Sequence, residues 1–161
     1  MATSDRTTSL KEGMTAPDFS ARTGDGEEIR LSQFRGRKVV LYFYPKDNTP
    51  GCTAEACAFR DLKDEMRALG AVVLGVSKDS AKSHQRFSAK HGLNFPLLAD
   101  TDQEVIRAYD VLKEKTMCGR TSLGVVRSTF IIDGEGVIRK VFGEVKVAGH
   151  DRQVLEALKA L

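Results

Sequence analysis

Residues 38–57 have the sequence Lys38-Val-Val-Leu-Tyr-Phe-Tyr-Pro-Lys-Asp-Asn-Thr-Pro-Gly-Cys-Thr-Ala-Glu-Ala-Cys57. The first part, residues 38–44, is β-branched and aromatic without polar alternation, which predicts a strand covered on both faces. Pro45 ends this strand. Thr49 followed by Pro50 is typical of a helix start, with threonine as the N-cap and proline at the first helical position. The stretch therefore predicts a buried strand, a short turn and the first turns of a helix.

The segments around this stretch alternate between strand-like and helix-like patterns. We expect strands at residues 71–76 and 94–99, and hairpins at residues 18–31 (around a turn at 23–26) and 127–142 (around a turn at 133–135). We expect helices at residues 50–68 and 80–91, from Thr101 or Asp102 to Tyr109, and at residues 151–161. Strands alternating with helices, followed by a terminal hairpin and helix, indicate an α/β sandwich around a mixed sheet.

The length and composition are those of one globular domain. The chain has 161 residues, 41% hydrophobic and 29% charged, which argues against disorder, a fibre or a coiled coil. Residues 1–10 are rich in threonine, serine and charge, so we expect a flexible tail there and a single domain over residues 11–161.

Charge and hydropathy exclude several classes of partner. The net charge of +3 is too small and too scattered to predict nucleic-acid binding. The longest apolar run, residues 39–44, is far shorter than the ~20 residues of a membrane span. The first fifteen residues hold no apolar stretch, so we expect no secretory signal and a cytoplasmic protein.

The chain has three cysteines, Cys52, Cys57 and Cys118. An odd number in a cytosolic protein argues against a framework of structural disulfides. This leaves three interpretations: core fillers, metal ligands or reactive thiols.

The metal interpretation has little support in the spacing. Cys52 and Cys57 match half of a plant-type iron–sulfur pattern, but the C-x₂-C continuation is missing. His84 and His91 lie two helical turns apart, which does not suit a zinc pair, and both flank Phe87, so we expect them to be packing residues. The absence of a C-x-x-C motif also disfavours a thioredoxin-type reductase.

Cys52 falls in the first turn of the predicted helix. The amides there lack intrahelical partners, and the helix dipole favours negative charge. This effect is worth only about 0.3–1 kcal/mol at exposed sites. A reactive thiolate at this position therefore needs a nearby cation as well, which the spacing alone does not identify.

Cys57 does not lie on the core-facing side of the helix. At 100° per residue, Cys52 is about 60° and Cys57 about 160° from the centre of the apolar stripe. That stripe consists of Phe59, Leu62, Met66 and Leu69. Positions five apart on a helix have Cα atoms about 8–9 Å apart, whereas a disulfide needs about 4.4–6.8 Å. The two cysteines can bond only if the helix start unwinds.

Pro45, Thr49 and Cys52 match the P-x-x-x-T-x-x-C signature of the peroxiredoxins. The longer string over residues 42–57 resembles the bacterioferritin-comigratory-protein subfamily. The resemblance extends from about Lys11 to the C-terminus and includes residues 16–19 and 127–133. It implies a thioredoxin-like fold and a thiol peroxidase activity that needs no metal or organic cofactor.

The resemblance also implies a role for each matching residue. Cys52 is similar to the peroxidatic cysteine, which becomes a sulfenic acid on attacking the peroxide O–O bond. Cys57 is similar to the resolving cysteine, which condenses with that acid to an intramolecular disulfide.

Three further residues match positions with family roles. Thr49 matches the hydroxyl that bonds thiolate and peroxide, and Pro45 the residue that shields the cysteine from water. Arg127 matches the arginine that steadies the thiolate and orients peroxide. The amides of Gly51 and Cys52 are further candidate donors to the peroxide.

Relatives of this kind are usually reduced by thioredoxin and are often monomers, so we expect both here. Cys118 departs from the family pattern; we expect a loop residue, with a second resolving thiol as the alternative. A redox sensor or binding module that uses the same disulfide switch, and a metal-binding domain, remain the competing interpretations of the chain.

Overall fold

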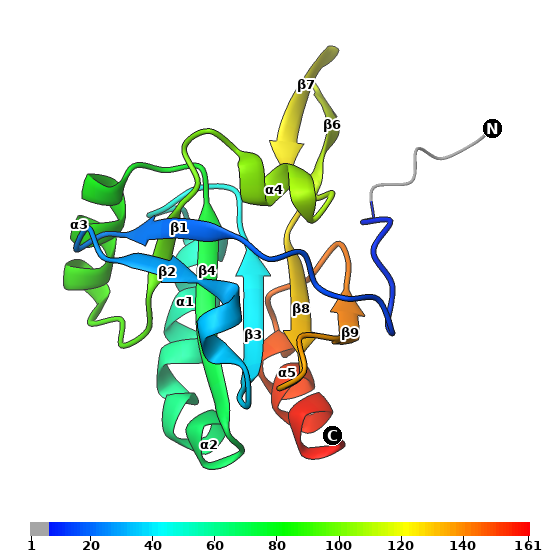
Figure 1. The fold of residues 1–161 in the computed structure, drawn as a ribbon. Coiled ribbons are helices and arrows are strands. Elements are labelled where there is room, and N and C mark those ends of the chain that lie inside the picture. The colour runs from blue at the N-terminus through cyan, green and yellow to red at the C-terminus, as the bar shows by residue number, and fades with distance from the viewer. Residues whose placement is uncertain (1–6) are drawn as a thin grey trace.

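The computed structural model describes residues 7–161, and its centre is one mixed β-sheet (Figure 1). The sheet has seven strands in the order β2-β1-β5-β4-β3-β8-β9. Their bounds are β1 Ser20–Thr23, β2 Glu28–Arg30, β3 Lys38–Phe43, β4 Ala71–Ser77, β5 Leu97–Ala99, β8 Ser128–Ile132 and β9 Ile138–Phe142. Strands β3, β4 and β5 run parallel, and the other pairings are antiparallel. This confirms the predicted mixed sheet.

Helices cover both faces of this sheet. Their bounds are η1 Leu31–Phe34, α1 Pro50–Asp61, α2 Lys63–Ala68, α3 Ala81–His91, α4 Glu104–Ala108 and α5 His150–Lys159. Side chains alternate along β3: Leu41 and Phe43 pack into a core with residues of α4, whereas Tyr42 packs into a second core with residues of α1, α2, α3 and α5. Because both faces are covered, the strand is apolar without alternation, as expected from its sequence.

The predicted helix over residues 50–68 is interrupted at Leu62. The amide of Leu62 is shared between the carbonyl oxygens of Ala58 at 3.3 Å and Phe59 at 3.2 Å. This tight turn separates α1 from α2 while Phe59 and Met66 both stay fully buried. Neither glycine nor proline marks the break, so the sequence carries no signal for it.

Helix α4 begins later than expected. Gln103, with a positive φ of 62°, occupies the N-cap position instead of Thr101 or Asp102. The buried carboxylate of Asp100 accepts hydrogen bonds from the amides of Val105 at 3.1 Å and Ile106 at 2.7 Å. A side chain outside the helix thus satisfies the first free amides.

A hairpin that we did not predict projects from the body of the protein (Figure 1). Its strands are β6 (Leu112–Met117) and β7 (Arg120–Val125), and they pair only with each other. Cys118 and Gly119 form the turn with φ angles of 52° and 77°, as in a type I′ turn. Most of β7 is exposed, so the hairpin lacks the buried face that produces a hydrophobic pattern. Cys118 is a turn residue with an exposed thiol.

The expected tail over residues 1–10 lies partly outside the described residues. Within the described part, Thr8 is buried and donates to the carbonyl oxygen of Tyr109 at 2.6 Å, and the amide of Ser9 donates to Asp110 at 2.8 Å. The packed chain therefore includes residues before Lys11. The division into a tail and a single domain over residues 11–161 stays a prediction. Among the helices in residues 7–161, none has the length and apolar character to cross a membrane.

Phe59 tests the packing that holds α1 on the sheet. We expect Phe59→Ala to lower the free energy of unfolding by about 3–5 kcal/mol, because the ring is fully buried against Tyr42. Leu123→Ala, at a position 59% exposed on the hairpin, is the control and changes it by less than about 0.5 kcal/mol. Urea unfolding of the reduced protein measures both. A loss below about 1 kcal/mol for Phe59→Ala would contradict the described packing.

Candidate active site

Cys52 lies in the first turn of α1, at the end of the sheet to which β3 leads. Strand β3 ends at Phe43, and residues 44–49 connect it to Pro50, the first helical residue. The Cys52 side chain is only 2% exposed and packs in the core on the α1 face of the sheet. The sequence placed Cys52 in this turn, and the structure confirms that position.

Arg127 places a cation beside Cys52. It directly precedes β8, and β8 is the neighbour of β3, with Ser128 opposite Phe43. The Nη2 atom of Arg127 donates to the sulfur of Cys52 at 3.3 Å. The sheet pairing therefore places the guanidinium against the cysteine, where its charge stabilises a negative sulfur.

Gly51 leaves room for this guanidinium. A Cβ atom at position 51 would lie 3.3 Å from Nη2 of Arg127, closer than most real contacts of such an atom. Because Gly51 has no side chain, the guanidinium of Arg127 has room to lie against the first turn of α1, beside Cys52. The amides of Gly51 and Cys52 belong to the first turn of α1, where backbone donors have no intrahelical acceptor.

Thr49 occupies the predicted N-cap position but does not cap with its side chain. Its backbone is extended, and its Oγ1 atom donates to the carbonyl oxygen of Lys46 at 2.9 Å instead of accepting from the helix. Thr49 lies three residues before Cys52 in the sequence. Its hydroxyl is held by the connecting loop through the bond to Lys46. Pro45 is half-buried at the start of that loop.

The three cysteines differ in exposure, and all are free thiols. Cys52 is buried, Cys57 is half-buried and Cys118 is exposed. The half-buried state of Cys57 agrees with the helical wheel, which placed it away from the core stripe. Both Cys52 and Cys57 lie within the continuous helix α1, whose geometry keeps positions five apart at about 8–9 Å between Cα atoms.

Residues 13–141 match the model of the AhpC/TSA family. The chain belongs to the AhpC/TSA family. A "Putative peroxiredoxin bcp" of Coxiella burnetii is 49% identical over 150 residues, which cover 93% of this chain and 99% of that protein. "Peroxiredoxin Bcp" of Bacillus subtilis is 45% identical over 150 residues, covering 93% and 96%.

Solved structures agree with these matches. The bacterioferritin comigratory protein of Xanthomonas campestris, studied for alkyl peroxide reduction, superposes with a TM-score of 0.87 at 46% identity and covers 95% of this chain and 98% of its own. A cysteine-to-serine mutant of PrxQ from Xylella fastidiosa has a TM-score of 0.90 at 41% identity, covering 94% and 96%. The expected family and thioredoxin-like fold are confirmed, and the chain is a peroxiredoxin with peroxidase activity.

Glu55 is a residue of this peroxiredoxin site that the sequence analysis missed. It is 2% exposed, and its Oε1 atom accepts from Nη1 of Arg127 at 2.6 Å. The guanidinium therefore contacts Glu55 with one nitrogen and Cys52 with the other. A signal was present, because Glu55 lies four residues before Phe59 and hence on the apolar stripe, where a carboxylate needs a buried partner.

The acid and the arginine influence each other's protonation. Burial raises the pKa of Glu55 to about 7, although Arg127 opposes part of the rise. Burial lowers the pKa of Arg127, but the charges of Glu55 and Cys52 outweigh burial and leave that pKa above its ordinary value. Arg127 is thus a cation at all pH values of interest, while Glu55 gains or loses its charge near neutrality.

His84 and His91, both expected to be packing residues, have different environments. His91 is half-buried and contacts the ring of Phe87 edge-on, with centroids 5.2 Å apart. His84 is fully buried, and both of its ring nitrogens have polar partners: Asp47 at 2.7 Å and the carbonyl oxygen of Leu98 at 2.9 Å. His84 is therefore more than a packing residue.

The raised pKa of Glu55 predicts a pH dependence of stability. A carboxyl whose pKa is about 7 in the folded protein, against an ordinary value of 4.5, binds its proton more tightly when folded. The contribution of this tighter proton binding to the free energy of unfolding is complete below about pH 4.5 and is lost as pH rises through 7. We expect the free energy of unfolding to fall between pH 5 and 8 more steeply in the parent protein than in Glu55→Gln.

Urea unfolding at several pH values measures this difference, and Glu65→Gln at an exposed position serves as the control. Parallel pH profiles for the parent protein and Glu55→Gln would show that Glu55 does not titrate in this range.

Proposed function

We propose that Cys52 is the peroxidatic residue of a thioredoxin-dependent peroxidase that reduces hydrogen peroxide and organic hydroperoxides. The observation that supports this role is the 3.3 Å contact between Arg127 and the sulfur of Cys52, in a turn rich in free backbone donors. The thiolate attacks one oxygen of the peroxide and the O–O bond breaks. Cys52 becomes a sulfenic acid, and the departing oxygen takes up a proton to leave as water or an alcohol.

The surrounding groups stabilise the charge that moves during this attack. Arg127 reaches the sulfur and can donate to the oxygen that approaches it, and the amides of Gly51 and Cys52, in the first turn of α1, are further candidate donors. The Thr49 hydroxyl is a further donor once it leaves the carbonyl oxygen of Lys46. Pro45 limits the access of water to the loop. Glu55 orients the guanidinium through its 2.6 Å bond, which makes it a positioning residue.

Cys57 is the proposed resolving residue. Its thiolate attacks the sulfur of the Cys52 sulfenic acid, a disulfide forms, and hydroxide leaves as water after taking a proton. Because an intact helix holds the two positions too far apart, the start of α1 must unwind for this step. The absence of a side-chain cap at Thr49 makes that start easier to open.

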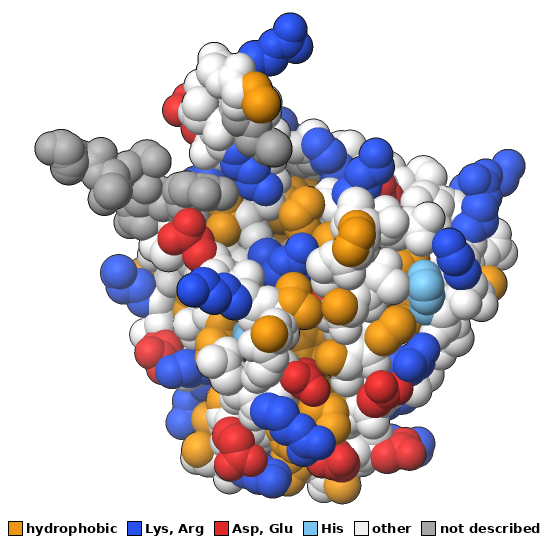
Figure 2. Space-filling view, turned by 180° about the vertical axis from the view of Figure 1, so that it is seen from behind, with side chains coloured by type: hydrophobic (Ala, Val, Ile, Leu, Met, Phe, Trp, Pro, Cys, Tyr) orange, Lys and Arg blue, Asp and Glu red, His pale blue; other side chains and the backbone are white. Residues whose placement is uncertain are grey.

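A partner dithiol, which we propose to be thioredoxin, returns the disulfide to two thiols and is itself oxidised. Figure 2 shows the face opposite the view of Figure 1, where hydrophobic side chains gather near the centre around a Lys or Arg side chain and further charged side chains lie toward the edge. Such a face suits contact with the apolar part of a peroxide or with a partner protein. We propose a cytoplasmic protein, because an odd number of cysteines suits a reducing compartment. We propose a monomer because proteins of the subfamily that the sequence resembles are often monomers.

Cysteine variants test the proposed cycle. We expect Cys52→Ser to abolish peroxide reduction, because the nucleophile is gone. Cys57→Ser should react once with peroxide, form the Cys52 sulfenic acid, and turn over at less than about a hundredth of the parent rate with thioredoxin and its reductase. Cys118→Ser is the matched control at an exposed thiol and should retain the parent rate within about twofold.

Peptide mapping by mass spectrometry identifies the bond formed after one equivalent of hydrogen peroxide and blocking of the remaining thiols. A Cys52–Cys57 disulfide supports the proposal. A Cys52–Cys118 disulfide would keep the peroxidase and replace the resolving residue. Three reduced thiols would contradict the proposal and favour a binding module.

A further inference from the structure

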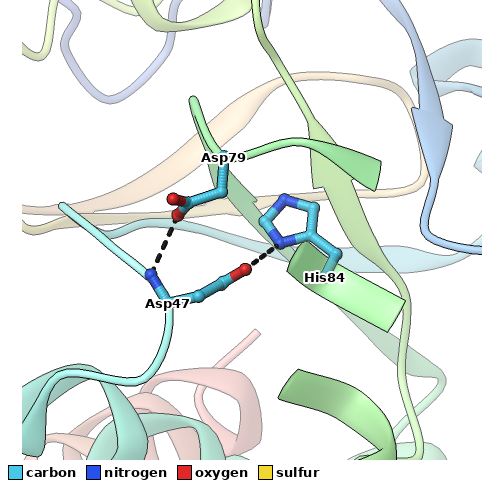
Figure 3. A group of neighbouring side chains, drawn as sticks. All are labelled: Asp47, Asp79 and His84. Carbon is cyan, nitrogen blue, oxygen red and sulfur yellow. Dashed lines mark hydrogen bonds and ion pairs between the residues drawn. The ribbon is translucent and has the colours of Figure 1, made fainter. Parts of the chain in front are cut away.

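Asp47, Asp79 and His84 form a cluster next to the active-site loop, residues 44–49 (Figure 3). Asp47 comes from this loop, Asp79 from the segment after β4, and His84 from α3. Their potential ligand atoms lie within 4.8 Å of one another, a spacing that a metal ion also requires. The hydrogen bonds of the cluster, however, already use the atoms that would face an ion.

The Asp47 carboxylate accepts three side-chain hydrogen bonds. Its Oδ1 atom accepts from the hydroxyl of Tyr44 at 2.6 Å, and its Oδ2 atom bonds Ser83 at 2.8 Å and Nδ1 of His84 at 2.7 Å. Burial raises the pKa of Asp47, but the bonds from His84, Tyr44 and Ser83 outweigh burial and leave that pKa below its ordinary value. The backbone of Asp47 is held as well, because its amide donates to Asp79 at 2.8 Å.

His84 is fixed from its other side too. Its Nε2 atom faces the carbonyl oxygen of Leu98 at 2.9 Å, and because a carbonyl oxygen only accepts, this nitrogen carries a proton. Its Nδ1 atom lies 2.7 Å from Oδ2 of Asp47. The cluster is thus a complete set of donors and acceptors that joins the loop to α3 and to β5.

The chain is held by fewer side-chain contacts directly after Asp47. Asn48 has a positive φ of 62°, Thr49 makes no side-chain cap, and the first turn of α1 contains no acidic residue. The loop before Asn48 is therefore firmly held, and the helix start after it is weakly held.

We propose that Asp47 and His84 are positioning residues of the peroxidatic site and form the fixed boundary of the rearrangement that joins Cys52 to Cys57. This inference rests on the proposed function. The loop stays bound to α3 and β4 throughout the cycle, and only the chain after Asn48 unwinds. In the reduced protein the same contacts hold the loop in the shape that presents Cys52 to peroxide.

The chain between Asp47 and Cys52 is long enough for the helix start to unwind while the loop stays bound. The chain advances five residue steps from Asp47 to Cys52 and can span about 16–18 Å when extended. Bringing Cys52 within disulfide distance of Cys57 requires a change of only a few ångströms in their separation. The movement therefore needs no break in the buried contacts of Asp47.

Amide hydrogen exchange in the reduced and disulfide forms of the full chain tests this boundary. The amide of Thr53, bonded to Thr49 at 2.8 Å, reports on the helix start. The amides of Tyr44, bonded to Val76 at 3.1 Å, and of Asp47 report on the loop. We expect exchange at Thr53 to accelerate at least a hundredfold on disulfide formation, and exchange at Tyr44 and Asp47 to change less than threefold.

Two substitutions at Asp47 separate positioning from charge. Asp47→Asn keeps every contact, because its amide group donates to Ser83 and to a neutral His84 while its oxygen still accepts from Tyr44. Asp47→Ala removes them all. We expect the rate constant for hydrogen peroxide to fall about tenfold in Asp47→Ala and to stay within about twofold of the parent value in Asp47→Asn.

Overoxidation gives a readout that a general loss of stability would not move. A loosened loop favours the unwound form, so the sulfenic acid is resolved before a second peroxide reacts. We expect about threefold less Cys52 sulfinic acid in Asp47→Ala at high peroxide. Asp100→Ala, which removes a buried carboxylate that binds α4, is the control. It should leave the rate constant for hydrogen peroxide and the amount of Cys52 sulfinic acid at the parent values. If Asp47→Ala does not fold, Ser83→Ala removes one of the three contacts and should slow the reaction about threefold.

Loss of protection at Tyr44 and Asp47 together with Thr53 would overturn the proposal, as would an Asp47→Asn variant as slow as Asp47→Ala. If no Cys52–Cys57 disulfide forms, the proposed function fails instead, and the rate constants of the Asp47 variants with peroxide still test the positioning role.

Discussion

The bridge that Arg127 makes between Glu55 and Cys52 is the contact on which the rest of the site depends. One guanidinium nitrogen lies 2.6 Å from a buried carboxylate and the other 3.3 Å from the sulfur. The half-buried guanidinium of Arg127 is stabilised by its partners, and the buried sulfur of Cys52 gains negative charge more easily beside this cation, so the three groups stabilise one another. The pairing of β3 with β8, the glycine at position 51 and the apolar cover on α1 all serve to bring these three groups together.

The site combines a firmly held loop with a loosely held helix start because the proposed reaction needs both. A nucleophile that meets peroxide needs donors in fixed positions. In the proposed cycle the same sulfur must then leave those donors to reach a second thiol in its own helix. The buried hydrogen bonds of Asp47 and the poorly capped start of α1 meet within a few residues, so the chain provides both properties side by side.

Much of this architecture follows from local patterns in the sequence. Continuous apolar strands, the Thr49–Pro50 helix start and turn glycines predict the layered fold, and the resemblance of residues 45–52 to the peroxiredoxin signature predicts the cysteine site. What could not be predicted depends on contacts between distant segments or on exposed segments without a hydrophobic face. The partnership of Arg127 with Glu55 exists only after β3 and β8 pair, and His84 gains its role only when α3 meets the loop. The hairpin of β6 and β7 buries too little to leave a pattern.

The different exposure of the three cysteines affects how oxidation of the protein can be measured with thiol reagents. A bulky thiol reagent applied without denaturant meets Cys118 first, at the tip of the projecting hairpin, and meets the 2% exposed Cys52 last. A titration of accessible thiols therefore measures mainly Cys118, with a slower contribution from the half-buried Cys57, and does not report directly on Cys52. Labelling must therefore follow denaturation if it is to report the state of Cys52, which lies buried in the core.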